Sequence, residues 1–106
     1  DAQDKVIRPC ILWNDGRTQK QVEYLNNVIG KENLSKYTAN IAFAGFTAPK
    51  LLWMRDTEPE NFTKISKIML PKDYINYKLT GVCFRHAAAG CAAQVLEQRN
   101  AGYLRR

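Results

Sequence analysis

The apolar residues of this chain follow two different periods. Residues 5–13 alternate loosely between apolar and polar side chains, which predicts a short strand, and residues 65–70 form an apolar run that suits a buried strand. Because Pro9 cannot donate a hydrogen bond to a neighbouring strand, we expect the first strand at a sheet edge or with a bend. The two segments contain the apolar residues Val6, Ile7, Ile11, Leu12, Ile65, Ile68, Met69 and Leu70.

Helical spacing dominates the other segments. Apolar residues between positions 22 and 29 predict a helix that opens at Thr18, which has capping-box spacing to Gln21, and that stops at Gly30. Because strands and helices alternate along the chain, the pattern predicts an α/β fold. Further helices are expected over residues 34–38, 48–55, 58–62 and 73–80, the last of them closed by Gly81.

The helix expected over residues 48–55 has the clearest start. Thr47 is a suitable N-cap, because its hydroxyl can accept a hydrogen bond from an unpaired N–H in the first turn. Pro49 fits that turn, where the N–H that it lacks would be unbonded anyway, and Gly45 lets the backbone bend before the cap. The simplest interpretation is an amphipathic helix that packs on a core.

Composition indicates one ordinary globular domain. The chain has 106 residues, 45% of them hydrophobic and 25% charged, with no apolar run of membrane-spanning length and no signal pattern. We therefore expect no membrane partner, and the small, odd number of cysteines favours a reducing, cytoplasmic location. Three cysteines do not support a disulfide framework, and Cys10 is expected to be buried. Because Cys83, His86 and Cys91 lack a fourth ligand at zinc spacing, no metal site is predicted.

The net charge of +6 raises the possibility of a nucleic-acid partner. Residues 83–106 contain four arginines and one glutamate, which account for +3, and residues 1–82 account for the other +3 with basic residues scattered among acidic ones. A solvated surface explains this distribution better than a nucleic-acid footprint. A small basic binding or interaction module without catalysis stays open as an alternative. Heparin retention after removal of residues 83–106 would favour it.

Four motifs in one order carry a more specific signal. They are RPCILWNDGRT at residues 8–18, GFTAPKLLW at 45–53, EPENF at 58–62 and LPKDYINYKLTG at 70–81. This series closely resembles the first domain of the xylulose kinases, which belong to the FGGY family of ATP-dependent carbohydrate kinases. The resemblance covers residues 1–82 almost continuously.

The resemblance implies a partial ribonuclease-H-like α/β domain with short strands and several helices. The implied parent activity is transfer of the γ-phosphoryl group of ATP to D-xylulose with Mg²⁺. In this family the phosphate-binding hairpin precedes the matched region, and the catalytic aspartate and the adenosine site follow it. We therefore expect an incomplete piece that is inactive alone, that binds neither ATP nor Mg²⁺, and that associates with the missing remainder of the kinase or with itself.

The residues expected to take part in sugar binding are Trp13, Asp15 and Arg17. An aromatic face packs on the C–H surface of a sugar, while a carboxylate and a guanidinium bond to its hydroxyls. In kinases that this chain resembles, the matching tryptophan region borders the sugar pocket. The alternative is that Trp13 belongs to the core and that Asp15 and Arg17 form a structural turn. For Lys50 and Trp53 in the second motif, a structural role is favoured and no binding role is assigned.

Residues 83–106 depart from the family pattern. Codons for this tail, read one base later, can spell a sequence like the family's own continuation, ASGTLLLDVQHRCWNNETLDIC. We therefore hypothesise an out-of-frame translation after a deletion near Val82, which the coding DNA would test. The competing interpretation is a genuine C-terminal helix over residues 87–98, where helix propensity is high.

Overall fold

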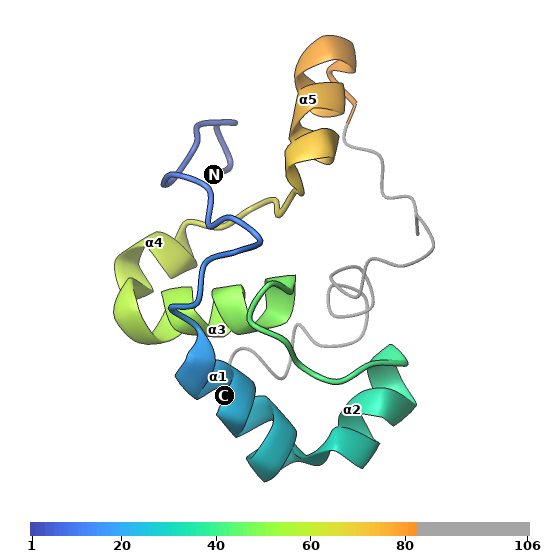
Figure 1. Ribbon diagram of the computed structural model, residues 1–106. Coiled ribbons are helices and arrows are strands. Elements are labelled where there is room, and N and C mark those ends of the chain that lie inside the picture. The colour runs from blue at the N-terminus through green and yellow to red at the C-terminus, as the bar shows by residue number, and fades with distance from the viewer. Residues whose placement is uncertain (83–106) are drawn as a thin grey trace.

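The structure, a computed structural model, describes residues 1–82 (Figure 1). The predictions for the tail, including its helix and the residues Cys83, His86 and Cys91, lie outside this part of the chain. The described residues form α1 (Gln19–Glu23), the π-helix η1 (Tyr24–Gly30), α2 (Lys31–Thr38), α3 (Thr47–Thr57), α4 (Pro59–Thr63) and α5 (Pro71–Thr80).

The predicted helices are confirmed, with small changes at their ends. The first runs from α1 directly into η1, and Gly30 interrupts it with a φ of +91°, a conformation that suits glycine. The chain then turns at once into α2. Gly81, with a φ of +70°, closes α5 as its position predicts.

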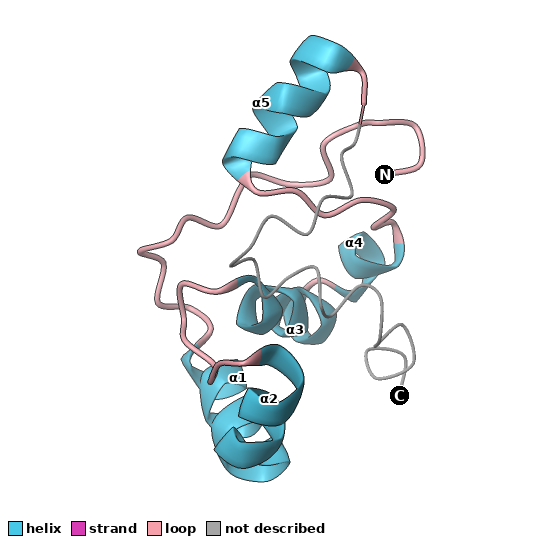
Figure 2. Cartoon of the chain, turned by 90° about the vertical axis from the view of Figure 1, so that its right-hand side faces the viewer, coloured by secondary structure: helices cyan, strands magenta, loops and turns pink. Residues whose placement is uncertain are grey.

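The two predicted strands are not confirmed, since residues 1–82 contain no strand (Figure 2). Residues 5–13 and 65–70 connect the helices as irregular backbone. A strand exists only when a neighbour accepts and donates its backbone hydrogen bonds, and no segment within residues 1–82 does so for either run. The prediction that Cys10 is buried is wrong for the same reason: with nothing paired beside it, Cys10 is exposed.

Thr18 is the N-cap residue of α1, as its position predicts, but its expected capping bond is absent, and the predicted cap at Thr47 is wrong. Neither Thr18 nor Thr47 makes a side-chain cap bond, and Thr47 is the first residue of α3, with Phe46 in the cap position. The Thr18 hydroxyl instead donates to the carbonyl oxygen of Ala44 at 3.3 Å, and its side chain is fully buried. The capping bond that local spacing predicts for Thr18 is absent because the hydroxyl has a partner in a distant loop.

The core is small and lies where η1, α3 and the loop before α3 meet. Its buried centre consists of Leu25, Ala42 and Leu52. Asn26 fixes the loop against η1 through two bonds to Ala42: its amide nitrogen donates to the Ala42 carbonyl at 2.9 Å, and its amide oxygen accepts from the Ala42 N–H at 3.0 Å. Partly buried apolar side chains around this centre are Val22, Ile29, Leu34 and Ala48.

Helix α5 stands at one end of the described part, opposite α1 and α2, in both views (Figures 1 and 2). It has no buried residue. Lys67 links it to the N-terminal turn, because its ammonium group bonds to the carboxylate of Asp4 and donates to the Tyr77 hydroxyl at 3.3 Å. Two polar bonds with little apolar contact hold α5 less firmly than a packed face would.

Candidate functional site

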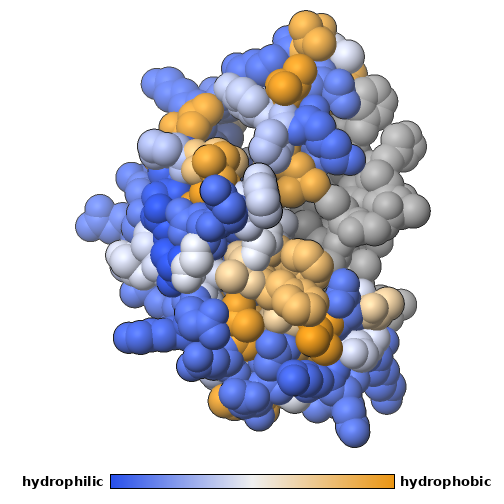
Figure 3. All heavy atoms as spheres, viewed as in Figure 1, coloured by the Kyte–Doolittle hydropathy of each residue, from blue (hydrophilic) through white to orange (hydrophobic). Residues whose placement is uncertain are grey.

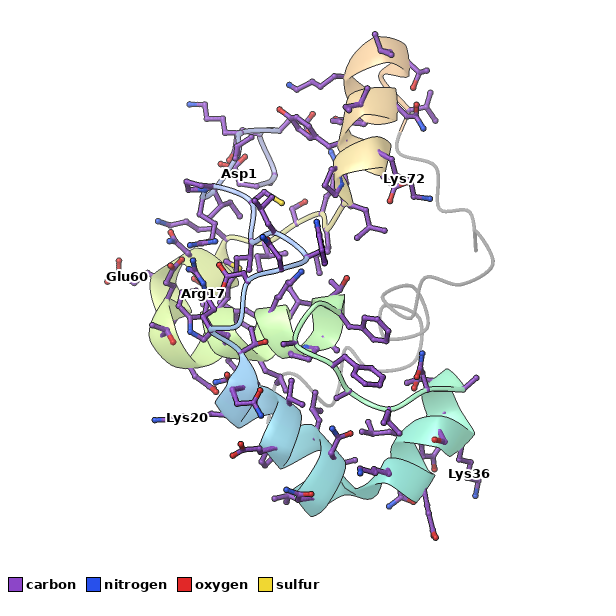
Figure 4. All side chains as sticks on the ribbon, in the orientation of Figure 1. Asp1, Arg17, Lys20, Lys36, Glu60 and Lys72 are labelled. Carbon is purple, nitrogen blue, oxygen red and sulfur yellow. The ribbon has the colours of Figure 1, made fainter. Side chains whose placement is uncertain are left out.

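The three residues expected to bind sugar lie on one loop, in residues 13–18, immediately before α1. Trp13 is 81% exposed, so the interpretation of Trp13 as a core residue is wrong. Asp15 is half-buried and Arg17 is exposed. Figure 4 shows Arg17 between the N-terminal segment and the α3–α4 region.

Asp15 and Arg17 form a tight local ion pair. The Arg17 Nε donates to both carboxylate oxygens of Asp15, at 2.9 and 3.0 Å, and Nη2 lies 2.8 Å from Oδ2. The Arg17 backbone N–H also donates to Asp15 Oδ1 at 3.0 Å, which closes a turn. These bonds from Arg17 lower the pKa of Asp15, and the same carboxylate raises the pKa of Arg17. Asp15 is therefore an ionised acceptor at neutral pH.

The indole ring next to this pair belongs to Trp53 of α3. The guanidinium carbon of Arg17 lies 4.8 Å from the ring centroid of Trp53, and that of Arg8 lies 5.4 Å from it. Both distances suit a cation–π contact. Arg8 is held in turn by Glu58, whose carboxylate accepts from its Nε at 2.9 Å. The bond from Asn61 at 3.0 Å, followed by the bond from Arg8, lowers the pKa of Glu58.

The loop before α3 fixes the backbone of the predicted site. Thr18 bonds to Ala44, as described above, and Gly45 packs against the carbonyl of Trp13 so closely that an added Cβ would lie 2.8 Å from its oxygen. Lys50 donates from Nζ to the Gly45 carbonyl oxygen at 2.8 Å. The local partner found for Lys50 supports the structural role favoured for it.

The arrangement offers groups for a polyhydroxylated ligand. An ionised carboxylate accepts hydrogen bonds from hydroxyls, a guanidinium donates them, and an exposed indole covers apolar C–H groups. Residues 1–82 contain no group of three or more His, Cys, Asp or Glu side chains that could hold a metal ion. Within the same residues no helix is long and apolar enough to cross a membrane.

The sequence predicts the loop of residues 13–18 but not all of the side chains that surround it. It grouped Asp15 and Arg17 correctly, and it did not predict that Trp53, Arg8 and Glu58 gather beside them. The available signal was the position of Trp53 at the end of the second motif, where an aromatic residue follows two leucines in α3. A separate hollow of about 370 Å³ between α1 and α3 contains none of the three predicted site residues.

Comparison with known protein families identifies the scaffold. The N-terminal domain of the FGGY family of carbohydrate kinases matches residues 1–98. The chain belongs to the FGGY family of carbohydrate kinases. Individual relatives agree: the xylulose kinase of Staphylococcus xylosus is 49% identical over 81 residues, and that of Escherichia coli K12 is 47% identical over 81 residues.

A solved structure shows the same relationship in three dimensions. The crystal structure of a xylulose kinase from Brucella ovis superposes with a TM-score of 0.70 at 47% identity, over 76% of this chain and 16% of that one. The two sequence relatives are likewise matched over 76% of this chain. This FGGY chain spans only 16–17% of the length of those curated relatives.

Proposed function

We propose that this chain forms part of the sugar-binding side of an ATP-dependent xylulose kinase. The parent protein would transfer the γ-phosphoryl group of ATP to D-xylulose with Mg²⁺. The observation that carries the proposal is the pairing of Asp15 with Arg17 on a loop whose tryptophan, Trp13, is open to solvent in a chain of the FGGY family. The open face of the Trp13 indole is free to contact a ligand beside this ion pair.

Each of the three residues has its own part in this proposal. The Asp15 carboxylate accepts hydrogen bonds from sugar hydroxyls, and its low pKa keeps it in the accepting form. Arg17 holds that carboxylate and presents its remaining N–H groups to the same hydroxyls. The exposed face of Trp13 covers the C–H surface of the sugar. Together they bind and orient the ketose, and they do not activate its hydroxyl.

The phosphoryl-transfer groups would come from the remainder of the kinase. ATP and Mg²⁺ would bind there. The ribonuclease-H-like sheet would also be completed there, with strand partners for residues 5–13 and 65–70. The 106-residue chain by itself would be inactive, and its parent would work in the cytoplasm.

A hybrid enzyme tests the sugar-binding role. The matched segment of the Escherichia coli xylulose kinase, which is 47% identical, is replaced by the corresponding residues of this chain. We expect ATP-dependent phosphorylation of D-xylulose by the hybrid. Asp15→Asn and Trp13→Ala should each raise the KM for D-xylulose by about tenfold or more, as the loss of one charge-assisted or stacking contact predicts, while the KM for ATP stays unchanged.

The matched control is Lys36→Ala, which removes an exposed charge on α2, away from the loop (Figure 4). It should leave both KM values unchanged. An active hybrid whose KM for D-xylulose does not respond to Asp15→Asn or Trp13→Ala would contradict the proposed sugar site. A change in the KM for ATP alone would contradict it as well.

A second candidate function is that of a self-associating interaction piece. Large apolar side chains lie open on the described surface, among them Leu79 at 80% exposed and the edge-to-face pair of Phe43 and Phe46, whose ring centroids are 5.3 Å apart. Figure 3 shows apolar atoms gathered over the loop between α2 and α3. Association between copies, or with the remainder of the kinase, would cover such surface.

A further inference from the structure

Trp53 is the point at which two charged side chains from the N-terminal segment meet helix α3. Its ring centroid lies 4.8 Å from the guanidinium of Arg17 and 5.4 Å from that of Arg8. Trp53 is half-buried and does not belong to the buried core centre. Its charged neighbours are the guanidinium groups of Arg17 and Arg8. Arg17 is paired with Asp15, and Arg8 is paired with Glu58.

A series of direct contacts runs from helix α4 to the predicted sugar loop. Asn61 donates to Glu58 at 3.0 Å, Glu58 accepts from Arg8 at 2.9 Å, and Arg8 also donates to the carbonyl oxygen of Pro9 at 2.7 Å. Arg8 and Arg17 then share the Trp53 ring. The Trp53 indole is therefore in contact with two guanidinium groups, each of which is paired with a carboxylate.

The flexibility of arginine explains why such an arrangement matters. An exposed Arg side chain loses considerable rotamer freedom when it is held in one geometry, so a local Asp–Arg pair on an open loop interchanges among several arrangements. A flat aromatic face restricts the plane of the guanidinium, because the cation prefers to lie over the ring. Once the Arg17 plane is fixed, its two nitrogens can meet both oxygens of Asp15, as they do here: Nε lies 2.9 Å from Oδ1 and Nη2 lies 2.8 Å from Oδ2.

We propose that Trp53 is a positioning residue for the sugar loop: its indole orients the Arg17 guanidinium, and Arg17 in turn orients the Asp15 carboxylate. Trp53 touches no sugar in this account. Its importance for sugar binding rests on the proposed function, whereas the orienting effect itself concerns only contacts within residues 1–82.

The charge state of Asp15 reports on this arrangement without any ligand. Arg17 is the main cause of the lowered pKa of Asp15, through its side-chain and backbone bonds, and Lys50 adds a weaker attraction from α3. Loss of the Trp53 face should loosen the bidentate side-chain contact while the backbone bond and Lys50 remain. The pKa of Asp15 should then rise part of the way toward that of an ordinary aspartate.

The test is an NMR titration of side-chain carboxyl carbons in the 106-residue chain. Trp53→Leu, which removes the aromatic face, should raise the pKa of Asp15, and Trp53→Phe, which keeps a smaller one, should give an intermediate value. Trp13→Leu is the matched control, since the exposed Trp13 is not the ring beside Arg17. Trp53→Leu with an unchanged Asp15 titration and only a lower melting temperature would overturn the proposal.

A second measurement keeps the indole in place, in case the Leu variant does not fold. With Trp13→Phe as background, Trp53 is the sole tryptophan and its fluorescence reports the neighbouring guanidinium. Arg17→Gln should change its emission, whereas Arg55→Gln, in the same helix, should not. Identical emission with and without Arg17 would overturn the proposal. Neither readout depends on D-xylulose, so a hybrid enzyme insensitive to Asp15→Asn would contradict the sugar site and leave the positioning role standing.

Discussion

At Gly45 the backbone of the chain has no room for a side chain. An added Cβ would lie 2.8 Å from the carbonyl oxygen of Trp13, closer than real Cβ contacts. The contact joins the predicted sugar loop to the segment before α3, where Lys50 also bonds to the Gly45 carbonyl. Gly45 is therefore required for a close approach of two backbones, and not for an unusual backbone angle.

We expect Gly45→Ala to destabilise the chain by about 1–3 kcal/mol, the usual cost of overpacking against atoms that cannot move away. Gly16→Ala is the matched control, because a Cβ at Gly16 meets nothing within 4 Å. The control should change the free energy of unfolding by less than about 1 kcal/mol. Urea unfolding followed by circular dichroism measures both, and equal effects of the two substitutions would contradict the close approach.

The carboxylates of Asp15 and Glu58, which pair with the two arginines beside Trp53, make the free energy of unfolding depend on pH. The pKa values of Asp15 and Glu58 are lower in the folded chain than in an unfolded one, because Arg17 bonds to the first, and Asn61 and then Arg8 bond to the second. Their contribution is fully present above the ordinary pKa values of about 3.9 for Asp and 4.3 for Glu, and is lost as the pH falls through the lower folded values.

The urea midpoint should therefore fall between pH 6 and pH 3. The double variant Asp15→Asn and Glu58→Gln, which cannot gain a proton at either site, should show a smaller fall. Because both groups are at the surface, we expect a modest difference. If the double variant loses as much stability as the unchanged chain over this range, the ion pairs beside Trp53 do not contribute to folding.

At the scale of the elements, Asn26 joins η1 to the loop that leads into α3. Its side-chain amide makes both hydrogen bonds of the Ala42 peptide groups and so takes the place of a neighbouring strand. Ala42 is itself buried in the core centre. Without the amide, a buried N–H and a buried C=O would lack partners.

We expect Asn26→Ala to cost about 1–3 kcal/mol, the range for leaving buried polar groups unpaired. Asn27→Ala, at the next and exposed position of the same helix, should stay within about 0.5 kcal/mol. Amide hydrogen exchange gives a local check, because the Ala42 N–H should lose its protection in the Asn26 variant alone. Retained protection of the Ala42 N–H in that variant would contradict the proposed role of the two hydrogen bonds between Asn26 and Ala42.

The elements also show which structural features follow from sequence. Helices were predictable, because apolar spacing and the glycines at 30 and 81 act within a few residues of where they stand. Residues 5–13 and 65–70 have strand-like patterns, but pairing depends on a distant neighbour that residues 1–82 do not supply. Within the site, the Asp15–Arg17 pair is local and was foreseen. Its contact with Trp53 spans thirty-six positions and has no local signature.

At the scale of the whole molecule, helix α5 carries apolar surface that is exposed in the described part of the chain. Ile75 and Leu79 are exposed one turn apart on α5, and Val82 is exposed just beyond the helix. The spacing is that of a face which normally packs on another element. The match covers only 16–17% of the length of the xylulose kinases of Staphylococcus xylosus and Escherichia coli.

We expect the mass of the 106-residue chain in light scattering to rise with concentration, because copies cover this face for one another. Leu79→Lys should lower that mass toward the monomer value. Asn76→Lys is the matched control, since it adds the same charge to an exposed position of the same helix. A concentration-independent monomer mass for the unchanged chain would contradict self-association through this face.

We propose that this chain supplies the sugar side of a kinase and that phosphoryl transfer takes place in the rest of the protein. The most direct test of this proposal is to incubate the purified 106-residue chain with ATP, Mg²⁺ and D-xylulose and to follow xylulose phosphate by mass spectrometry, with the full-length Escherichia coli kinase as the positive control. We expect no product above that of the sample without protein. Phosphorylation of D-xylulose by the 106-residue chain alone would contradict the proposal.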